Sequence, residues 1–166
     1  MPAACATAYV GVGSNLADPR AQVERALQRL AGLPHSRLLR CSHLYRSAPW
    51  GVLEQPDFVN AAAAIETGLS PQALIQALLA IERDAGRDRG GDRWGPRILD
   101  LDLLLYGALT LAEPGLQLPH PHLHERAFVL LPLAEIAPHL DVPGRGPISA
   151  LLANVDTASC HPIDTA

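Results

Sequence analysis

Two carboxylates interrupt an apolar run in the stretch DRWGPRILDLDLLLYG, which covers residues 92–107. The surrounding leucines predict a β-strand, on which Asp100 and Asp102 would lie about 6.5–7 Å apart on one face. Two like charges at that spacing repel each other and need a cation beside them. A hard divalent ion such as Mg²⁺ is held by one or two carboxylates together with substrate phosphates and water. The pair therefore predicts a magnesium site that serves phosphate chemistry.

The loop before this strand, GRDRGGDRWGPR, is rich in arginine and broken by glycine. Its arginines could neutralise a polyphosphate, as phosphoryl or pyrophosphoryl transfer requires. They could instead pair with the two carboxylates in a cluster that holds no ligand, and the sequence leaves both interpretations open. The cations concerned are Arg87, Arg89, Arg93 and Arg97. All 13 basic residues of the chain are arginine, and the absence of lysine excludes P-loop and lysine Schiff-base chemistry.

Aromatic residues near these polar motifs suggest a site for a flat ring. The chain has only two tryptophans, three tyrosines and two phenylalanines, and several of them fall beside loops or strand ends: Trp50, Phe58, Trp94 and Phe128. Such rings could stack on a planar heterocycle, while the amide of Asn60 reads its edge with one donor and one acceptor. Ordinary packing is the alternative for each ring taken alone.

The segment LPHPHLHER carries histidines at alternate positions, which are His120, His122 and His124. Alternate spacing brings three rings together only on a regular strand, and Pro119 and Pro121 oppose a strand here. A zinc site is therefore the weaker interpretation. Contact of His120 and Arg126 with a phosphate suits the segment better.

Two helices are marked by a capping residue followed by proline. Asp18 and Pro19 open the first, which Gly32 ends, and Ser70 and Pro71 open the second, which Gly86 ends. A third helix is predicted within AFVLLPLAEIAPHL, interrupted by Pro132.

Strands are predicted on both sides of these helices. AYVGVG precedes the first helix, and the mixed extended segment SRLLRCSHLYRSAP and the strand FVNAAAAIETG lie between the first and the second. The aspartate strand follows the second helix, and its leucines at 99, 101, 103 and 105 would face a core while the aspartates face away. This order predicts an α+β, ferredoxin-like antiparallel sheet with helices on one face and the active site on the other.

Length and charge limit the class of protein. The 166 residues predict a single domain, with a frayed tail from about residue 156. A net charge of -4 gives no general attraction to nucleic acid or anionic membranes. No apolar run reaches the roughly 20 residues of a membrane span, and the N-terminus has no basic region of a signal peptide. We therefore expect a cytoplasmic protein.

Taken in order, GSNL, QPDFVNAA, RWGPRILDLDLLLYG and LPHPHLHERAFVLLPLAEIAP resemble the 6-hydroxymethyl-7,8-dihydropterin pyrophosphokinases of folate biosynthesis over nearly the whole chain. The resemblance implies a ferredoxin-like monomer that transfers pyrophosphate from ATP to the hydroxymethyl group of the pterin and releases AMP. It also implies two Mg²⁺ ions, with ATP and the pterin as small-molecule partners and neither nucleic acid nor membrane, and it leaves open an association with other folate enzymes.

The resemblance further implies a role for each matching residue. The catalytic positions would be Arg87, Arg97, Asp100 and Asp102, with the two aspartates as metal ligands. The pterin would contact Ser47, Ala48, Phe58, Asn60, Trp94 and Phe128. The nucleotide would contact Glu82, Arg97, His120 and Arg126.

The chain departs from the family pattern at Gly90, Gly115 and Pro121, where some members carry basic or tyrosine residues. We expect these changes to affect nucleotide affinity and loop dynamics. Two other classes stay open on the sequence: a nucleotide- or metal-binding regulatory module on the same fold, and a zinc hydrolase built on the histidine segment.

Overall fold

In the computed structural model of the chain, the described residues are 5–15, 18–47, 57–86 and 99–163. The main elements follow in the predicted order of strand, helix, strands, helix and strand. They are β1 (Ala6–Ser14), α1 (Pro19–Ala31), β2 (Ser36–Cys41), β3 (Tyr45–Ser47), β4 (Phe58–Thr67), α2 (Pro71–Asp84) and β5 (Asp100–Tyr106).

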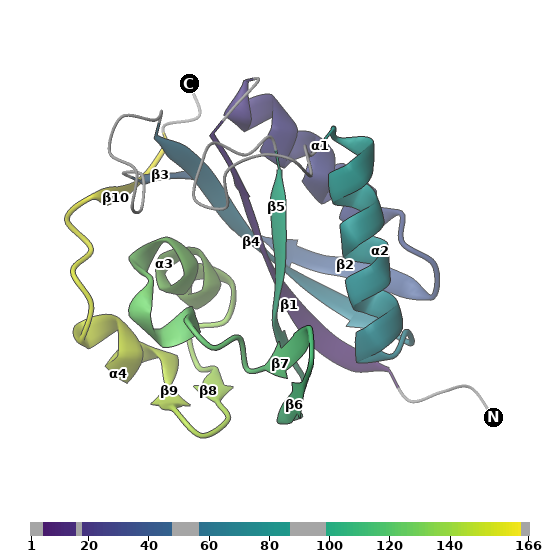
Figure 1. Cartoon of the computed structure of the whole chain (residues 1–166). Coiled ribbons are helices and arrows are strands. Elements are labelled where there is room, and N and C mark those ends of the chain that lie inside the picture. Colours follow the sequence, from purple (N-terminus) through teal and green to yellow (C-terminus); the bar gives the residue numbers. More distant parts are fainter. Residues whose placement is uncertain (1–4, 16–17, 48–56, 87–98, 164–166) are drawn as a thin grey trace.

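The central sheet is antiparallel throughout its described pairings. Its strand order is β10-β3-β4-β1-β5, with β2 paired to the same long strand β4 as β3. β10 (Cys160–Pro162) is the last strand among the described residues. The predicted ferredoxin-like α+β fold is confirmed, and Figure 1 shows β5 crossing in front of β1 and β4.

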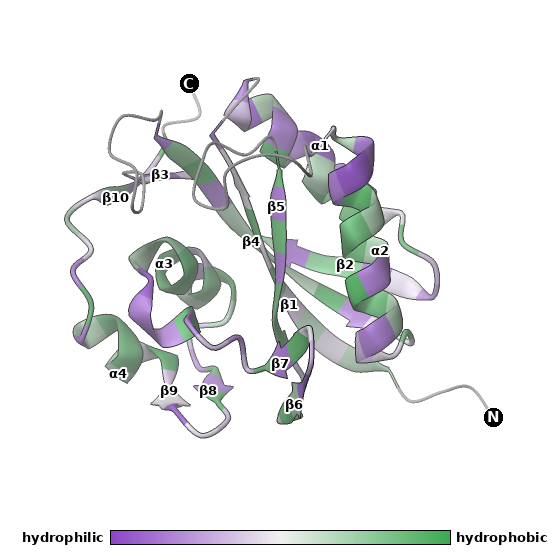
Figure 2. Cartoon of the chain, in the orientation of Figure 1, coloured by the Kyte–Doolittle hydropathy of each residue, from purple (hydrophilic) through white to green (hydrophobic). Residues whose placement is uncertain are grey.

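Helices α1 and α2 lie on one side of the sheet (Figure 1) and begin where their capping signals predict. Asp18 Oδ1 accepts a hydrogen bond from Ala21 N, and Ser70 Oγ accepts one from Ala73 N. The buried faces of these helices pack on alternating residues of β1, β4 and β5. Figure 2 shows this arrangement as hydrophobic colour along the sheet and on the inner faces of the two helices.

A bulge in β5 changes the alternation that the sequence predicts. Leu99, Leu101 and Leu103 face the core under α1 and α2, as expected. The register with β1 then shifts, since Tyr9 pairs with Leu105 and Val10 with Leu103. Leu105 therefore packs in the cluster on the opposite side of the sheet. The sequence had predicted that it faces the same core as the other three leucines.

Helices α3 (Ala127–Ile136) and α4 (Ile148–Ala153) lie on the other side of the sheet, beside the face that carries the aspartates (Figure 1). α3 continues through Pro132, where an interruption was predicted. Proline removes one backbone hydrogen bond, and the buried side chains of Leu130 and Leu133 pack in a cluster with β5 and α4 that offsets this loss.

Smaller elements complete the chain. Two hairpins, β6 (Leu111–Glu113) with β7 (Leu116–Leu118) and β8 (Asp141–Val142) with β9 (Gly146–Pro147), flank the single-turn helix η1 (Leu123–Glu125). The end of the chain differs from the predicted frayed tail, because β10 pairs with β3 and Ile163 N donates to Leu44 O. None of the helices in the described part of the chain has the length and apolar character needed to cross a bilayer.

Candidate functional site

The candidate site lies along one row of residues that runs across four strands. Asp100 of β5 is opposite Gly13 of β1, Gly13 is opposite Asn60 of β4, and Asn60 is opposite Tyr45 of β3. Residues directly opposite in antiparallel strands share a face, and adjacent strands are about 4.8 Å apart. The predicted metal ligand and the predicted ring-reading amide therefore share one face, with the width of one strand between them.

Gly13 is the position in this row with the least room for a side chain on this face. A methyl group added at this position would lie 3.0 Å from Asn60 Oδ1, tighter than ordinary side-chain contacts. The next glycine on the same face, Gly11, is opposite Asp102 and has more room, since the same addition would meet Leu104 at 3.5 Å. Because Gly13 has no side chain, the Asn60 amide can occupy its observed position next to β1.

Asn60 is held from the side of β3. Its Nδ2 donates a hydrogen bond of 2.7 Å to Ser47 Oγ, and both side chains are buried. Ser47 is in turn opposite Phe58, which lies on the same face of β4 two residues before Asn60. The structure thus brings together three of the residues predicted to contact a pterin.

His120 lies against the second aspartate. Its Nε2 is 3.9 Å from Asp102 Oδ1, and its backbone N–H donates to Leu104 O at 2.9 Å, which ties the loop to β5. Burial of the ring, with a smaller effect of the positive Arg126, lowers the pKa of His120 to about 4. The imidazole is therefore neutral at neutral pH.

The tautomer of His120 follows from its other nitrogen. Nδ1 lies 3.2 Å from His122 N, a backbone donor, so Nδ1 accepts and carries no proton. The proton of the neutral ring is then on Nε2, which faces Asp102. This nitrogen is a hydrogen-bond donor beside the aspartates, as expected of a residue that contacts a phosphate.

Phe128 and Arg126 lie at the start of α3. The Arg126 guanidinium carbon is 5.6 Å from the centre of the Phe128 ring, so a cation lies over the ring face. Both residues line a hollow of about 550 Å³ that also reaches Ser47 of β3. The hollow therefore connects a predicted nucleotide contact with two predicted pterin contacts.

Glu82 lies on the opposite side of β5 from the open face. It is 2% exposed on α2, and its Oε2 accepts a hydrogen bond of 2.7 Å from Leu101 N. Leu101 is the residue between the two aspartates, so Glu82 supports the backbone of the strand that carries them. Its predicted contact with a nucleotide stays a prediction.

The three histidines of the loop turn toward different partners. His120 faces Asp102, whereas His122 Nδ1 and His124 Nε2 lie 3.1 and 3.5 Å from the two carboxylate oxygens of Glu125. Within the described ranges, no group of three or more histidine, cysteine or acidic residues has the arrangement of a metal site. This geometry does not favour the zinc hydrolase interpretation.

Four predicted site residues, Ala48, Arg87, Trp94 and Arg97, lie outside the described residues. Their predicted roles stay predictions, as does the alternative of an arginine cluster around the aspartates. Sequence reasoning also missed two participants, Gly13 and Tyr45. The motif GSNL, which begins at Gly13 and contributed to the family resemblance, was the one local signal at this position.

Comparison with protein families gives a match over most of the chain. The model of the family described as 7,8-dihydro-6-hydroxymethylpterin-pyrophosphokinase (HPPK) matches residues 9–138. A Pseudomonas aeruginosa protein named 2-amino-4-hydroxy-6-hydroxymethyldihydropteridine pyrophosphokinase is 51% identical over 145 residues, covering 87% of this chain and 89% of the relative. A Haemophilus influenzae protein of the same name is 45% identical over 146 residues, covering 88% and 91%.

Solved structures give the same result for the fold. The wild-type HPPK-DHPS of Plasmodium falciparum matches with a TM-score of 0.70 at 12% identity. The match covers 90% of this chain and 44% of the solved chain, so this chain spans less than half of that longer protein. At such low identity the likeness is evidence for the fold alone.

Proposed function

We propose a function for this chain from its family. It belongs to the 7,8-dihydro-6-hydroxymethylpterin-pyrophosphokinase family, a family of diphosphokinases that carry out pyrophosphoryl transfer in folate biosynthesis. On this basis it transfers pyrophosphate from ATP to 6-hydroxymethyl-7,8-dihydropterin. The hydroxymethyl oxygen attacks the β-phosphorus of ATP, the bond from that phosphorus to the oxygen bridging the α-phosphate breaks, and AMP leaves. The hydroxyl proton is released, and the product is the pterin diphosphate.

The observation that carries this proposal is the row from Asp100 through Gly13 to Asn60. A pyrophosphokinase must hold a charged phosphate chain and a flat heterocycle side by side, with the attacking oxygen at their junction. In this row a carboxylate on β5 and a ring-reading amide on β4 share one face, separated only by a glycine. Because Gly13 has no side chain, the Asn60 amide lies close over it and so approaches the strand that carries the aspartates.

Asp100 and Asp102 are the residues that would hold Mg²⁺. Their oxygen donors suit a hard cation, and the Asp102 side chain is 36% exposed, which leaves room for phosphate oxygens and water. When bound, magnesium supplies charge neutralisation on the polyphosphate during transfer. We propose two such ions, as the family resemblance implies.

On the nucleotide side, His120 and Arg126 would contact the phosphates. The neutral His120 ring offers its Nε2 proton as a donor, and Arg126 offers a permanent positive charge. Glu82, Arg87 and Arg97 are proposed to act on the same side. Arg97 would contact the phosphates directly, and Arg87 would stabilise charge in the transition state.

On the pterin side, Asn60 would read the edge of the ring from its place beside Ser47. Phe58 and Phe128 would stack on the ring faces, with Ala48 and Trp94 completing the pocket. An amide and two rings suit this heterocycle because its faces are apolar and its edge carries both donors and acceptors.

The test is incubation of the purified protein with ATP, Mg²⁺ and 6-hydroxymethyl-7,8-dihydropterin, followed by chromatography of the nucleotides and pterins. We expect AMP and the pterin diphosphate in equal amounts. ADP in place of AMP would indicate transfer of a single phosphate. Nucleotide binding without turnover would instead support the regulatory module.

A further inference from the structure

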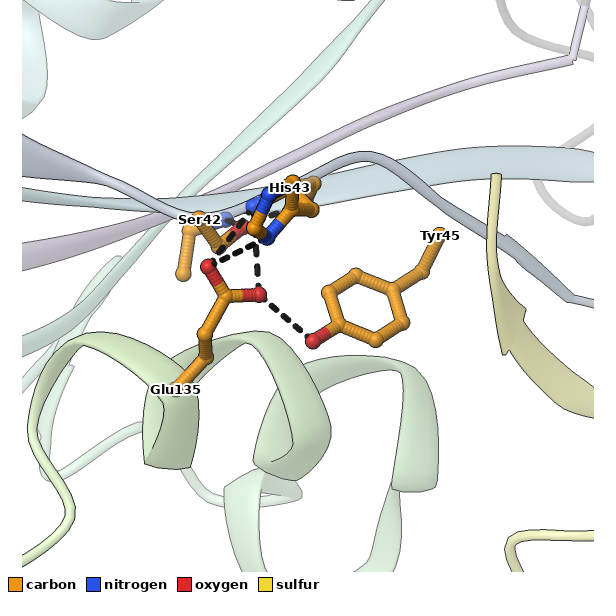
Figure 3. Close-up of polar contacts among 5 residues, drawn as sticks. Ser42, His43, Tyr45 and Glu135 are labelled. Carbon is orange, nitrogen blue, oxygen red and sulfur yellow. Dashed lines mark hydrogen bonds and ion pairs between the residues drawn. The ribbon is translucent and has the colours of Figure 1, made fainter. Parts of the chain in front are cut away.

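Glu135 is the only charged residue of α3, whose sequence is AFVLLPLAEI. An isolated carboxylate on an apolar helix is costly unless it has good partners. Figure 3 shows that Glu135 points from α3 to the connection between β2 and β3, where it meets His43 and Tyr45. The hydrogen bonds are 2.6 Å from Tyr45 Oη to Oε1, and 3.2 and 3.0 Å from His43 N to the two carboxylate oxygens.

Tyr45 is fixed as the donor in this contact. Its side chain is buried, and this burial, followed by the hydrogen bond to Glu135, raises the pKa of the phenol above its ordinary value. The hydroxyl therefore keeps its proton and donates to the carboxylate. A hydrogen bond from a buried hydroxyl to an ionised acceptor belongs to the stronger class.

The segment between β2 and β3 is also held by hydrogen bonds to β4. Ser42 Oγ accepts a hydrogen bond of 2.9 Å from Ala62 N and donates one of 2.7 Å to His43 O (Figure 3 includes Ser42). The segment that leads into β3 is thus held between β4 and α3. Its position depends on both contacts.

The two elements joined by this contact also carry two predicted pterin contacts, Ser47 on β3 and Phe128 on α3. β3 bears Tyr45 and, two residues later on the same face, Ser47. α3 bears Glu135 and, two turns earlier, Phe128. Ser47 and Phe128 line the same hollow, whereas Tyr45 and Glu135 lie outside its lining.

We propose that the Glu135–Tyr45 contact is a latch that sets the spacing between β3 and α3, and so positions Ser47, Asn60 and Phe128 for the pterin. This inference rests on the proposed function. Glu135 and Tyr45 act as positioning residues, because they reach the substrate only through the elements they join. β3 carries only proposed pterin contacts, whereas α3 carries Phe128 and, at its N-cap, the proposed nucleotide contact Arg126. The latch should therefore influence pterin binding more than ATP binding.

The test replaces Tyr45 with phenylalanine, which removes the hydroxyl and keeps the ring. We expect the KM for the pterin to rise about fivefold, which is part of the roughly tenfold or more that one hydrogen bond to an ionised group is worth, with the KM for ATP within about twofold. Glu135→Ala should raise the pterin KM at least as far. Glu135→Gln, whose amide oxygen still accepts from Tyr45, should recover most of the wild-type value.

Tyr106→Phe is the matched control. The Tyr106 hydroxyl donates to Leu69 O at the far end of β5, so the variant also loses one partly buried hydrogen bond, away from the pocket. A merely structural latch would give both variants a lower melting temperature and an unchanged pterin KM. That result would overturn the inference.

A second measurement separates this inference from the proposed function. Amide hydrogen exchange reports the stability of β3 whether or not the protein turns over, and Tyr45→Phe should speed exchange at residues 45–47 while Tyr106→Phe does not. Unchanged exchange in β3 would overturn the latch even in an active enzyme. Wild-type protein that forms no AMP would instead overturn the proposed function, with the exchange experiment still deciding on the latch.

Discussion

Two glutamates tie helices to the strands that carry the candidate site, and they do so differently. Glu82 of α2 accepts a backbone N–H from Leu101 of β5 and is 2% exposed. Glu135 of α3 accepts the side-chain hydroxyl of Tyr45 on β3, and its side chain is 28% exposed. One contact holds a strand by its backbone, and the other holds it by a side chain.

The place of each strand in the sheet explains the difference. β5 is the end strand of the described order, so its outer backbone groups have no neighbouring strand and need another acceptor. β3 lies between β4 and β10, and its backbone is paired on both sides. Only a side chain of β3 is left to meet α3. We therefore expect Glu82 to support the backbone of an end strand, and Glu135 to set the distance of α3 from a strand that is already paired on both sides.

The largest expected effect concerns the strand that Glu82 supports. Replacing Asp100 or Asp102 with asparagine removes a charge that we propose binds Mg²⁺ and preserves the shape of the side chain, so turnover should fall about a thousandfold or more. Thermal stability should change little, since the Asp102 side chain is partly exposed. AMP formation at saturating substrate measures the effect, with Asp84→Asn, which alters an exposed ion pair with Arg29, as the control. Wild-type turnover in either variant would remove the metal assignment.

The next effect tests the backbone contact itself. Glu82→Ala leaves the Leu101 N–H without this acceptor and opens a small void, which should lower the free energy of unfolding by about 3 kcal/mol. Urea denaturation measures the change. Glu24→Ala is the control, because it breaks an exposed ion pair with Arg20 that contributes about 0.5 kcal/mol or less. Glu82→Gln should recover most of the loss, and a loss as small as that of Glu24→Ala would mean that the contact does not hold β5.

A third experiment asks whether the two regions meet at Gly13. Gly13→Ala would press a methyl group against Asn60 Oδ1, so the amide must shift and the pterin KM should rise about fivefold. Gly11→Ala, on the same strand and face, meets only the flexible end of Leu104 and is the control. Equal pterin KM values in the two variants would show that pterin binding does not depend on the position of the Asn60 amide over Gly13.

How far the sequence could predict this molecule depends on whether the signal is local. The caps at Asp18 and Ser70 were predictable because each side chain bonds to the backbone three residues later. The bulge that turns Leu105 away from the main core was not, since it arises from pairing with β1. The strand at Cys160 was also missed, because its partner β3 lies far away in the sequence.

The same distinction applies to the candidate site. Asp100 and Asp102 could be placed on one face from their spacing alone. The row that joins Asp100 to Asn60 through Gly13 could not, because strand register is set by tertiary pairing. Glu82 is a further example: its place on the nucleotide side came from the family resemblance and stays a prediction, whereas its contact with the strand backbone needed the structure.

The smallest expected effect separates the parts of the Glu135 contact. His43→Ala removes a ring whose Nδ1 lies 2.9 Å from Glu135 Oε2 but whose side chain is 69% exposed. Such exposed pairs contribute about 0.5 kcal/mol or less, and the backbone N–H of residue 43 still donates to Glu135 in the variant. Stability should therefore fall only slightly in urea, and the pterin KM should stay within about twofold of wild type. A pterin KM as high as that of Tyr45→Phe would show that the exposed ring, rather than the buried hydroxyl and the backbone, carries the spacing between β3 and α3.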